Sequence, residues 1–241
     1  AKKTLAFVGK GVIFDSGGLS IKVGDGMKSM KCDMSGAAAV AGAFKAIAQM
    51  KPKVNLEGYI PLVENMPSGS AYRVDDIITY RNGVTVEVQN TDAEGRLILA
   101  DALIEASEGK PDGIVDLATL TGSCVVALGD SIAAALSNSD TFRGKVIDAS
   151  EKAGERFWPM PLPSDYRALI DTPVATVANA GARAAGTITA GLFLQEFVNV
   201  DHWCHLDIAG PAFLDKTDGE NTAGGTGFGV RTLVQLAESY V

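Results

Sequence analysis

The sequence predicts an α/β fold in which a mixed, mostly parallel central sheet is covered by helices on both faces. Short apolar stretches alternate with longer segments of helical composition, as in folds built from strand–helix units. Several of these stretches are continuously apolar, as expected for strands buried on both faces. Because no repeat, low-complexity tract or linker divides the chain, residues 1–241 are expected to form a single domain.

The strands are expected where apolar residues are densest. Residues 4–8 (TLAFV) come first and end at a Gly-Lys-Gly turn, and residues 113–117 (GIVDL) form a second continuous apolar run. Further strands are expected at residues 55–63, 85–88, 132–136 and 203–208.

The helices are expected between these strands. Residues 36–50 are rich in Ala and contain no Pro, which favours a tightly packed helix. Residues 97–107 place apolar side chains at i, i+3 and i+4 spacing. Other helices are expected at residues 141–154, 190–198 and 230–239. Gly, Ser, Asp and Pro predict loops or turns at residues 14–34, 64–76, 157–163 and 224–229.

Composition narrows the class of protein. The chain has 29 acidic and 21 basic side chains, a formal net charge of −8, which argues against a nucleic-acid partner. Cys32, Cys124 and Cys204 form no CxxC pair, so a reducing, cytoplasmic location is expected. No apolar run approaches the ~20 residues of a membrane-spanning helix. Since the chain begins at Ala1 and soon enters a strand, we expect it to be a piece of a longer protein.

Charged side chains gather in a first loop region that follows a predicted strand. The carboxyl ends of strands are where open α/β sheets bind ligands. Asp15 in an ordinary turn and Asp33 as a helix N-cap are the alternatives to a functional role. A phosphate loop is excluded because the GxxxxGK[ST] pattern is missing. The charged residues of this region are Lys10, Asp15, Lys22 and Asp33.

A second charged loop is formed by residues 90–96. Asp92, Glu94 and Arg96 occupy alternate positions, so an extended segment would point all three to the same side. Two carboxylates this close repel, and a cation between them would relieve the repulsion. Carboxylate oxygens suit Mg²⁺, Mn²⁺ and Zn²⁺. An acidic turn capping the next helix is the alternative.

Together these segments resemble the leucyl aminopeptidases, the dinuclear cytosol aminopeptidases. The resemblance covers essentially the whole chain, in order and with matching spacing. Two stretches depart from the family pattern, residues 179–186 (NAGARAAG) and residues 226–229 (TGFG), and they bear on specificity and assembly. The matching segments are residues 8–11 (VGKG), 14–18 (FDSGG), Lys22, 30–34 (MKCDM), 64–67 (ENMP), 90–97 (NTDAEGRL), 116–122 (DLATLTG) and 205–210 (HLDIAG).

The resemblance implies a catalytic domain that removes the N-terminal residue of a peptide, preferably Leu or another apolar residue. The chemistry would use a hydroxide activated by two divalent ions, Mn²⁺ or Zn²⁺, with Mg²⁺ also tolerated. One ion would be held by Lys10, Asp15, Asp33 and Glu94, and the other by Asp15, Asp92 and Glu94.

The resemblance also implies roles for residues that hold no metal. Lys22 would stabilise the charge that develops on the substrate, and Arg96 would stabilise the intermediate or hold a bicarbonate ion. The first side chain of the peptide would be bound by Met30, Thr119, Gly122 and Ala209, with Ala212 as a further candidate.

The family carries an additional N-terminal domain, which is expected to be absent from this chain, and assembles as homohexamers. A DNA-binding protein, a scaffold that has lost its metals, and another two-metal hydrolase are the alternatives. The acidic net charge, the complete ligand set and the scarcity of histidine argue against them in turn. His202 and His205 would face opposite sides of a strand, so we interpret them as structural residues.

Overall fold

A six-stranded sheet forms the middle of the molecule in the computed structural model, which describes residues 1–240. β1, β3, β7 and β11 are parallel, β8 runs antiparallel to β11, and β9 is parallel to β8. The predicted mixed, mostly parallel sheet is therefore confirmed. In sheet order the strands are β3 (Asn55–Tyr59), β1 (Thr4–Gly9), β7 (Gly113–Ala118), β11 (Trp203–Asp207), β8 (Ala133–Ser137) and β9 (Phe157–Pro159).

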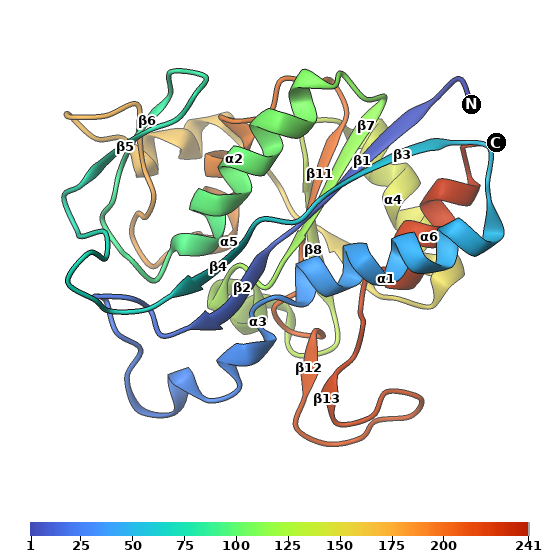
Figure 1. Ribbon diagram of the computed structural model, residues 1–241, viewed down its shortest axis with the longest axis horizontal. Coiled ribbons are helices and arrows are strands. Elements are labelled where there is room, and N and C mark those ends of the chain that lie inside the picture. Colours follow the sequence, from blue (N-terminus) through green and yellow to red (C-terminus); the bar gives the residue numbers. More distant parts are fainter. Residues whose placement is uncertain (241) are drawn as a thin grey trace.

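Helices cover both faces of this sheet (Figure 1). Side chains alternate across the central strands, so that Leu5 and Phe7 of β1 join one core cluster and Ala6 and Val8 join the other. The first face carries α1 (Ser35–Met50), α4 (Asp140–Ala153) and α6 (Val230–Glu238), and the second carries α2 (Glu94–Glu108) and α5 (Gly186–Gln195).

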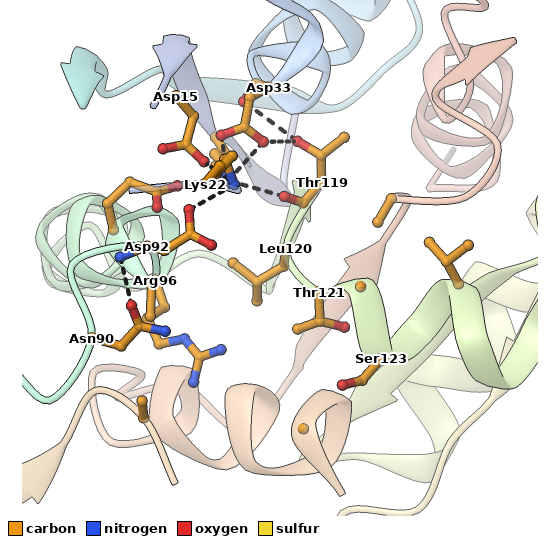
Figure 2. Close-up of a pocket in the computed structure, with 18 of the residues that line it drawn as sticks. Asp15, Lys22, Asp33, Asn90, Asp92, Arg96, Thr119, Leu120, Thr121 and Ser123 are labelled. Carbon is orange, nitrogen blue, oxygen red and sulfur yellow. Dashed lines mark hydrogen bonds and ion pairs between the residues drawn. The ribbon is translucent and has the colours of Figure 1, made fainter. Parts of the chain in front are cut away.

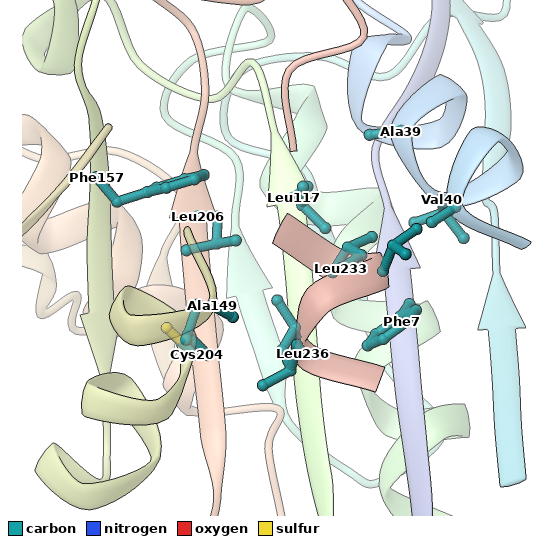
Figure 3. Close-up of a cluster of buried hydrophobic side chains, with 14 of the residues drawn as sticks. Phe7, Ala39, Val40, Leu117, Ala149, Phe157, Cys204, Leu206, Leu233 and Leu236 are labelled. Carbon is teal, nitrogen blue, oxygen red and sulfur yellow. The ribbon is translucent and has the colours of Figure 1, made fainter. Parts of the chain in front are cut away.

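The first core is closed by the C-terminal helix. Leu233 and Leu236 of α6 are fully buried against the sheet, beside Phe7 and Leu117 (Figure 3). Burying each leucine contributes about 1.5–3 kcal/mol. The sheet is thus held between two cores, and its strand ends are left to carry polar residues.

The first parallel strands continue beyond the main sheet in a second, two-stranded pair (Figure 1). β2 (Gly11–Asp15) follows β1, β4 (Leu62–Asn65) follows β3, and the two are parallel with a register shift between Val12 and Phe14. The prediction of one strand over residues 55–63 was wrong, because the chain leaves the ladder around Pro61, which has no N–H to donate. This extension carries Asp15 and Asn65 past the edge of the sheet.

Smaller elements fill in the loops. The strand predicted at residues 85–88 belongs to a separate sheet. Helix α5 begins at Gly186, four residues before the predicted start of a helix at residue 190. Helix α3 was not predicted; Thr121 caps it by accepting a hydrogen bond from the Cys124 N–H. The smaller elements are η1 (Gly24–Met27), η2 (Met30–Cys32), β5 (Ile77–Thr79), β6 (Thr85–Glu87), α3 (Gly122–Leu128), η3 (Ser164–Ile170), β10 (Val177–Ala178), β12 (Phe213–Leu214) and β13 (Gly224–Gly225).

The start of α1 packs directly on the ends of β1 and β7. A Cβ on Gly36 would lie 2.0 Å from the carbonyl oxygen of Leu117, so only glycine fits this position. The Ala37 N–H donates to the carbonyl of Lys10 at 2.8 Å. These contacts fix the residues just before α1 beside the carboxyl ends of two central strands. Within residues 1–240, no helix is long and apolar enough to cross a membrane.

Candidate metal centre

A cavity of about 450 Å³ opens at the carboxyl ends of β1 and β7. The sequence-predicted site residues come from seven of the matching segments, and all eleven line this cavity. Ala212, the additional pocket candidate, does not; it is buried in the first core and borders another cavity. The eleven residues are Lys10, Asp15, Lys22, Met30, Asp33, Asp92, Glu94, Arg96, Thr119, Gly122 and Ala209.

Lys10 joins two carboxylates on the inner side of the cavity. Its ammonium group lies 2.8 Å from both oxygens of Asp33 and 2.9 Å from Oε1 of Glu94. It also donates to the carbonyl oxygen of Thr119 at 2.9 Å. The three charged side chains are almost completely buried. Gly95 makes room for this lysine, because a Cβ there would lie 2.5 Å from Cε of Lys10.

Lys22 joins the other two predicted ligands. Its ammonium group lies 2.8 Å from Oδ2 of Asp15 and 2.6 Å from Oδ1 of Asp92. The second oxygen of Asp15 accepts hydrogen bonds from the Gly17 N–H at 2.8 Å and from Nδ2 of Asn65 at 2.9 Å. Figure 2 shows Asp15, Asp33 and Asp92 gathered around Lys22 from separate parts of the chain.

The local geometry of the second charged loop differs from the prediction. Helix α2 begins at Glu94, so Glu94 and Arg96 lie on a helix rather than on an extended segment, and the prediction that alternate residues share one side was wrong. Successive helical residues are about 100° apart, which turns Arg96 away from the carboxylates (Figure 2). Asp33 is not an N-cap either, because α1 begins at Ser35 and Met34 precedes it without a side-chain cap.

The charges of the cavity shift one another's pKa values. Burial lowers the pKa of both lysines, but neighbouring carboxylates outweigh it, so the pKa of Lys10 and of Lys22 lies above the ordinary value. Burial raises the pKa of Asp33 to about 7 and also raises the pKa of Asp92. Both lysines therefore carry protons at neutral pH in the ion-free protein, where two ammonium groups face four carboxylates.

The donor set fits divalent cations. Oxygen atoms of Asp15, Asp33 and Glu94 lie within 4.8 Å of one another. Oδ2 of Asp33 lies 2.8 Å from the Lys10 ammonium, and Oδ1 of Asp92 lies 2.6 Å from the Lys22 ammonium. Buried carboxylate oxygens are costly unless a cation or a proton satisfies them, and a divalent ion would compete with the two ammonium groups for these oxygens.

Arg96 places a further positive charge on the cavity wall. It is buried, its guanidinium carbon lies 6.0 Å from the centre of the Phe193 ring, and burial lowers its pKa to about 10. Its Nε has no hydrogen-bond partner among residues 1–240. A buried guanidinium on a cavity wall is suited to hold an anion.

Sequence reasoning missed two asparagines that position the charged loops. Asn65 donates to Asp15 and to the Thr91 carbonyl, both at 2.9 Å. Asn179 is fully buried; it donates to the Asn90 carbonyl at 2.7 Å and accepts from the Gln89 N–H at 2.8 Å. The sequence offered one signal for each asparagine: Asn65 lies in residues 64–67, which match the family, and Asn179 lies in residues 179–186, which depart from its pattern.

Asp207 was also missed, and it holds the wall opposite the carboxylates. It is fully buried at the end of β11, and its Oδ2 accepts from the Thr121 hydroxyl at 2.6 Å. Its Oδ1 accepts from the N–H groups of Leu120 and Ala209, both at 3.2 Å. One carboxylate thus ties together two loops of the predicted side-chain pocket.

The two histidines make structural contacts, as interpreted from the sequence. His202 is exposed, lies 3.1 Å from the Ser139 hydroxyl and stacks on Phe142. His205 is fully buried in β11, with Nδ1 2.5 Å from Oδ1 of Asp116. Among residues 1–240, the one group of side chains spaced to hold a metal ion contains no histidine.

The three-layer fold and the buried lysine–carboxylate cluster at its strand ends define a class of α/β domains built around a cation site. Residues 1–234 match the model of the cytosol aminopeptidase family, catalytic domain, and the chain belongs to this family. The family resemblance predicted from the sequence is thereby confirmed.

Similar proteins cover the whole chain. A probable cytosol aminopeptidase of Streptomyces avermitilis is 55% identical over 240 residues, which are 99% of this chain and 47% of that protein. One of Chlorobaculum tepidum is 53% identical over 242 residues, covering 100% of this chain and 48% of that protein. The chain therefore spans about half the length of these relatives.

Solved structures agree with the fold. The bottromycin maturation enzyme BotP superposes with a TM-score of 0.94 at 44% identity, over 99% of this chain and 52% of that one. BotP in complex with Mn gives a TM-score of 0.95 at 45% identity, over 98% and 53% of the two chains.

Proposed function

We propose that residues 1–241 form the catalytic domain of a metal-dependent aminopeptidase that removes the N-terminal residue from peptides. The observation that carries this proposal is the buried cluster of four carboxylates and two lysines on the wall of a cavity, in a chain of the cytosol aminopeptidase family. A preference for Leu or another apolar first residue is part of the proposal.

The cluster would hold two divalent ions, Mn²⁺ or Zn²⁺, with Mg²⁺ also compatible with the oxygen ligands. The Mn complex of the similar protein BotP supports this choice. Lys10, Asp15, Asp33 and Glu94 would hold one ion, and Asp15, Asp92 and Glu94 the other. When bound, such ions supply Lewis acidity and a water of lowered pKa. As a ligand, Lys10 must give up the proton that its carboxylate neighbours now stabilise.

The remaining residues orient the peptide and stabilise charge. Met30, Thr119, Gly122 and Ala209 would surround the first side chain, since they line the same cavity and are small or apolar at their contact surfaces. The Lys22 ammonium would stabilise negative charge that develops on the carbonyl oxygen. Arg96 would hold that charge or a bicarbonate ion, which can carry a proton.

The family also suggests where and how the protein works. We propose a cytoplasmic location and a homohexameric assembly. Assembly is supported by apolar side chains that remain exposed around β2 and β4, including Ile21 at 53%, Leu62 at 63% and Val23 at 83% exposure. Peptides are the proposed substrates, and the acidic net charge argues against nucleic acid.

The test is hydrolysis of leucine p-nitroanilide by chelator-treated protein before and after addition of Mn²⁺ or Zn²⁺. We expect metal to restore activity. Lys22→Ala and Arg96→Ala should each lower kcat by at least about 10²-fold, because each removes a charge that acts on the transition state. Their Mn²⁺ affinities, measured by calorimetry, should change far less.

Lys28→Ala is the matched control for Lys22→Ala. Lys28 lies in the same loop region but is exposed and pairs only with Asp25 among residues 1–240. The Lys28→Ala variant should leave kcat unchanged. A near-normal kcat in Lys22→Ala or Arg96→Ala would show that the assigned role is wrong, and failure to bind metal would contradict the function itself.

A further inference from the structure

A second cavity, of about 590 Å³, adjoins the candidate metal centre. Four residues line both cavities, which together are called the recess; they are Gly122, Ser123, Arg183 and Gly186. Figure 2 shows Ser123 on the far side of the first cavity from Asp15 and Asp33. A peptide whose amine lies at the carboxylate cluster has room to continue past Ser123 into the second cavity.

The two ends of this recess differ in charge. The metal-centre end is lined by four carboxylates together with Lys10, Lys22 and Arg96, whereas no Asp or Glu among residues 1–240 lines the second cavity. Arg183 is the one charged side chain there. The other residues that line only the second cavity are small or uncharged: Val126, Ala127, Met160, Ala185, Thr187 and Ile188.

The guanidinium group of Arg183 is free to bind a ligand. Most other arginines pair with a carboxylate, and Arg143, Arg167 and Arg231 are examples. No carboxylate among residues 1–240 pairs with Arg183, which is exposed at the boundary of the two cavities. An unpaired arginine facing a recess without acidic groups at that end is suited to an anionic group of the substrate.

The loop that carries Arg183 is anchored at both ends. Asn179 ties its start to the backbone of Gln89 and Asn90, close to the ligand Asp92. Its end passes into helix α5 at Gly186. The other residues between these anchors are alanines and one glycine, so Arg183 is the only long side chain of the loop. Its backbone is therefore held in a defined position relative to the metal centre.

From this arrangement we propose that Arg183 binds the C-terminal carboxylate of the peptide, and that short peptides with a free carboxyl terminus are the preferred substrates. This inference rests on the proposed aminopeptidase function and names its substrate class. A short peptide is a zwitterion; its amine would lie at the metal centre, and its carboxylate is suited to the arginine at the other end of the recess. The planar guanidinium can receive both carboxylate oxygens at once.

The experiment compares peptides that differ only in the C-terminal charge. Leu-Gly, Leu-Gly-Gly and Leu-Gly-Gly-Gly are each assayed as free acid and as C-terminal amide with the Mn²⁺-loaded protein, beside leucinamide. Each added residue moves the carboxylate by about 3.3–3.6 Å, so the ratio of kcat/KM for acid over amide should be highest at one length. That ratio should fall as salt is added, because the arginine is exposed.

Arg183→Gln should lower the highest acid-to-amide ratio by about two- to fivefold, mainly through KM, since exposed charge pairs contribute modestly. Hydrolysis of leucinamide should not change. Arg183→Glu should invert the preference toward amides. Arg156→Gln, which removes an exposed arginine outside both cavities, is the matched control and should leave every ratio unchanged.

Two results would overturn the inference while leaving the proposed function in place. One is a wild-type protein that hydrolyses leucinamide but prefers no acid over its amide at any length. The other is an acid preference that persists in Arg183→Gln. If the Mn²⁺-loaded wild type hydrolyses neither leucinamide nor any peptide, the proposed function fails and the inference fails with it.

Discussion

Two groups of buried charge lie within the same fold, one at the strand ends and one inside the sheet layer. At the strand ends Lys10 pairs with Asp33 and Glu94. Inside, Asp116 of β7 accepts from Nε1 of Trp203 at 2.7 Å and lies 2.5 Å from Nδ1 of His205. Both groups are almost inaccessible to solvent, and both combine carboxylates with cationic or hydrogen-bond-donating side chains.

The two groups differ in how the protein satisfies the carboxylate oxygens. Both oxygens of Asp116 have donors from neighbouring strand β11, and none of the three residues lines a described cavity. In the candidate metal centre, Oδ2 of Asp33 and Oδ1 of Asp92 are paired instead with the ammonium groups of Lys10 and Lys22, and all four side chains border a cavity. Burial and charge alone therefore do not distinguish a binding site from a structural ion pair; the position of the charged groups at a cavity does.

The largest expected effect on stability comes from the internal group. Asp116→Ala should lower the free energy of unfolding in urea by about 3–5 kcal/mol, because it leaves the Trp203 and His205 donors buried without a partner. Asp116→Asn, which keeps an acceptor, should cost less. Asp140→Ala, which breaks an exposed ion pair, is the control and should change the free energy of unfolding by less than about 1 kcal/mol. A change that small in Asp116→Ala would remove the contrast between the two groups.

In the candidate metal centre, substitution of a carboxylate should cost less stability in the ion-free protein but remove the stabilisation by metal. At a Mn²⁺ concentration of 100 times Kd, the wild type should gain about 2.7 kcal/mol of stability for each ion bound. Asp33→Asn should lose most of this gain, together with peptidase activity. Its ion-free stability should fall less than that of Asp116→Ala, because Lys10 keeps Glu94 and the Thr119 carbonyl as partners. Asp25→Asn is the control at an exposed carboxylate, and an equal loss of Mn²⁺ response there would contradict the ligand assignment.

The smallest expected effect is a pH dependence of the internal group. Burial opposes protonation of His205, but the Asp116 carboxylate outweighs it and raises the pKa of His205 above its ordinary value. The ion pair therefore stabilises the fold fully below the unfolded-state pKa, about 6.5, and this contribution is lost as pH rises through the folded-state pKa. In ion-free protein, the difference in urea midpoint between wild type and His205→Gln should shrink as pH rises above about 6.5. A difference that grows with pH would mean that His205 is buried uncharged.

The sequence by itself determined the layers of the fold and the composition of the site. Continuous apolar runs such as residues 4–8 and 113–117 must be buried on both faces, and this predicts a covered parallel sheet. The carboxylates and lysines of two loops, together with their resemblance to a known family, were enough to select eleven residues that meet in one cavity. Their roles in catalysis remain predictions.

Only the tertiary structure decided how these side chains pair and what holds them. Local spacing placed Glu94 and Arg96 on one side, but packing of α2 against the sheet begins the helix at Glu94 and turns the two apart. The contacts of Asn65 with Thr91, of Asn179 with Asn90 and of Asp207 with Thr121 join residues 26, 89 and 86 positions apart in the chain, so no local pattern encodes them. Pairing of Lys10 with Asp33, and the free guanidinium of Arg183, likewise follow from which strand ends lie side by side, because a hydrogen bond depends on position in space rather than on sequence separation.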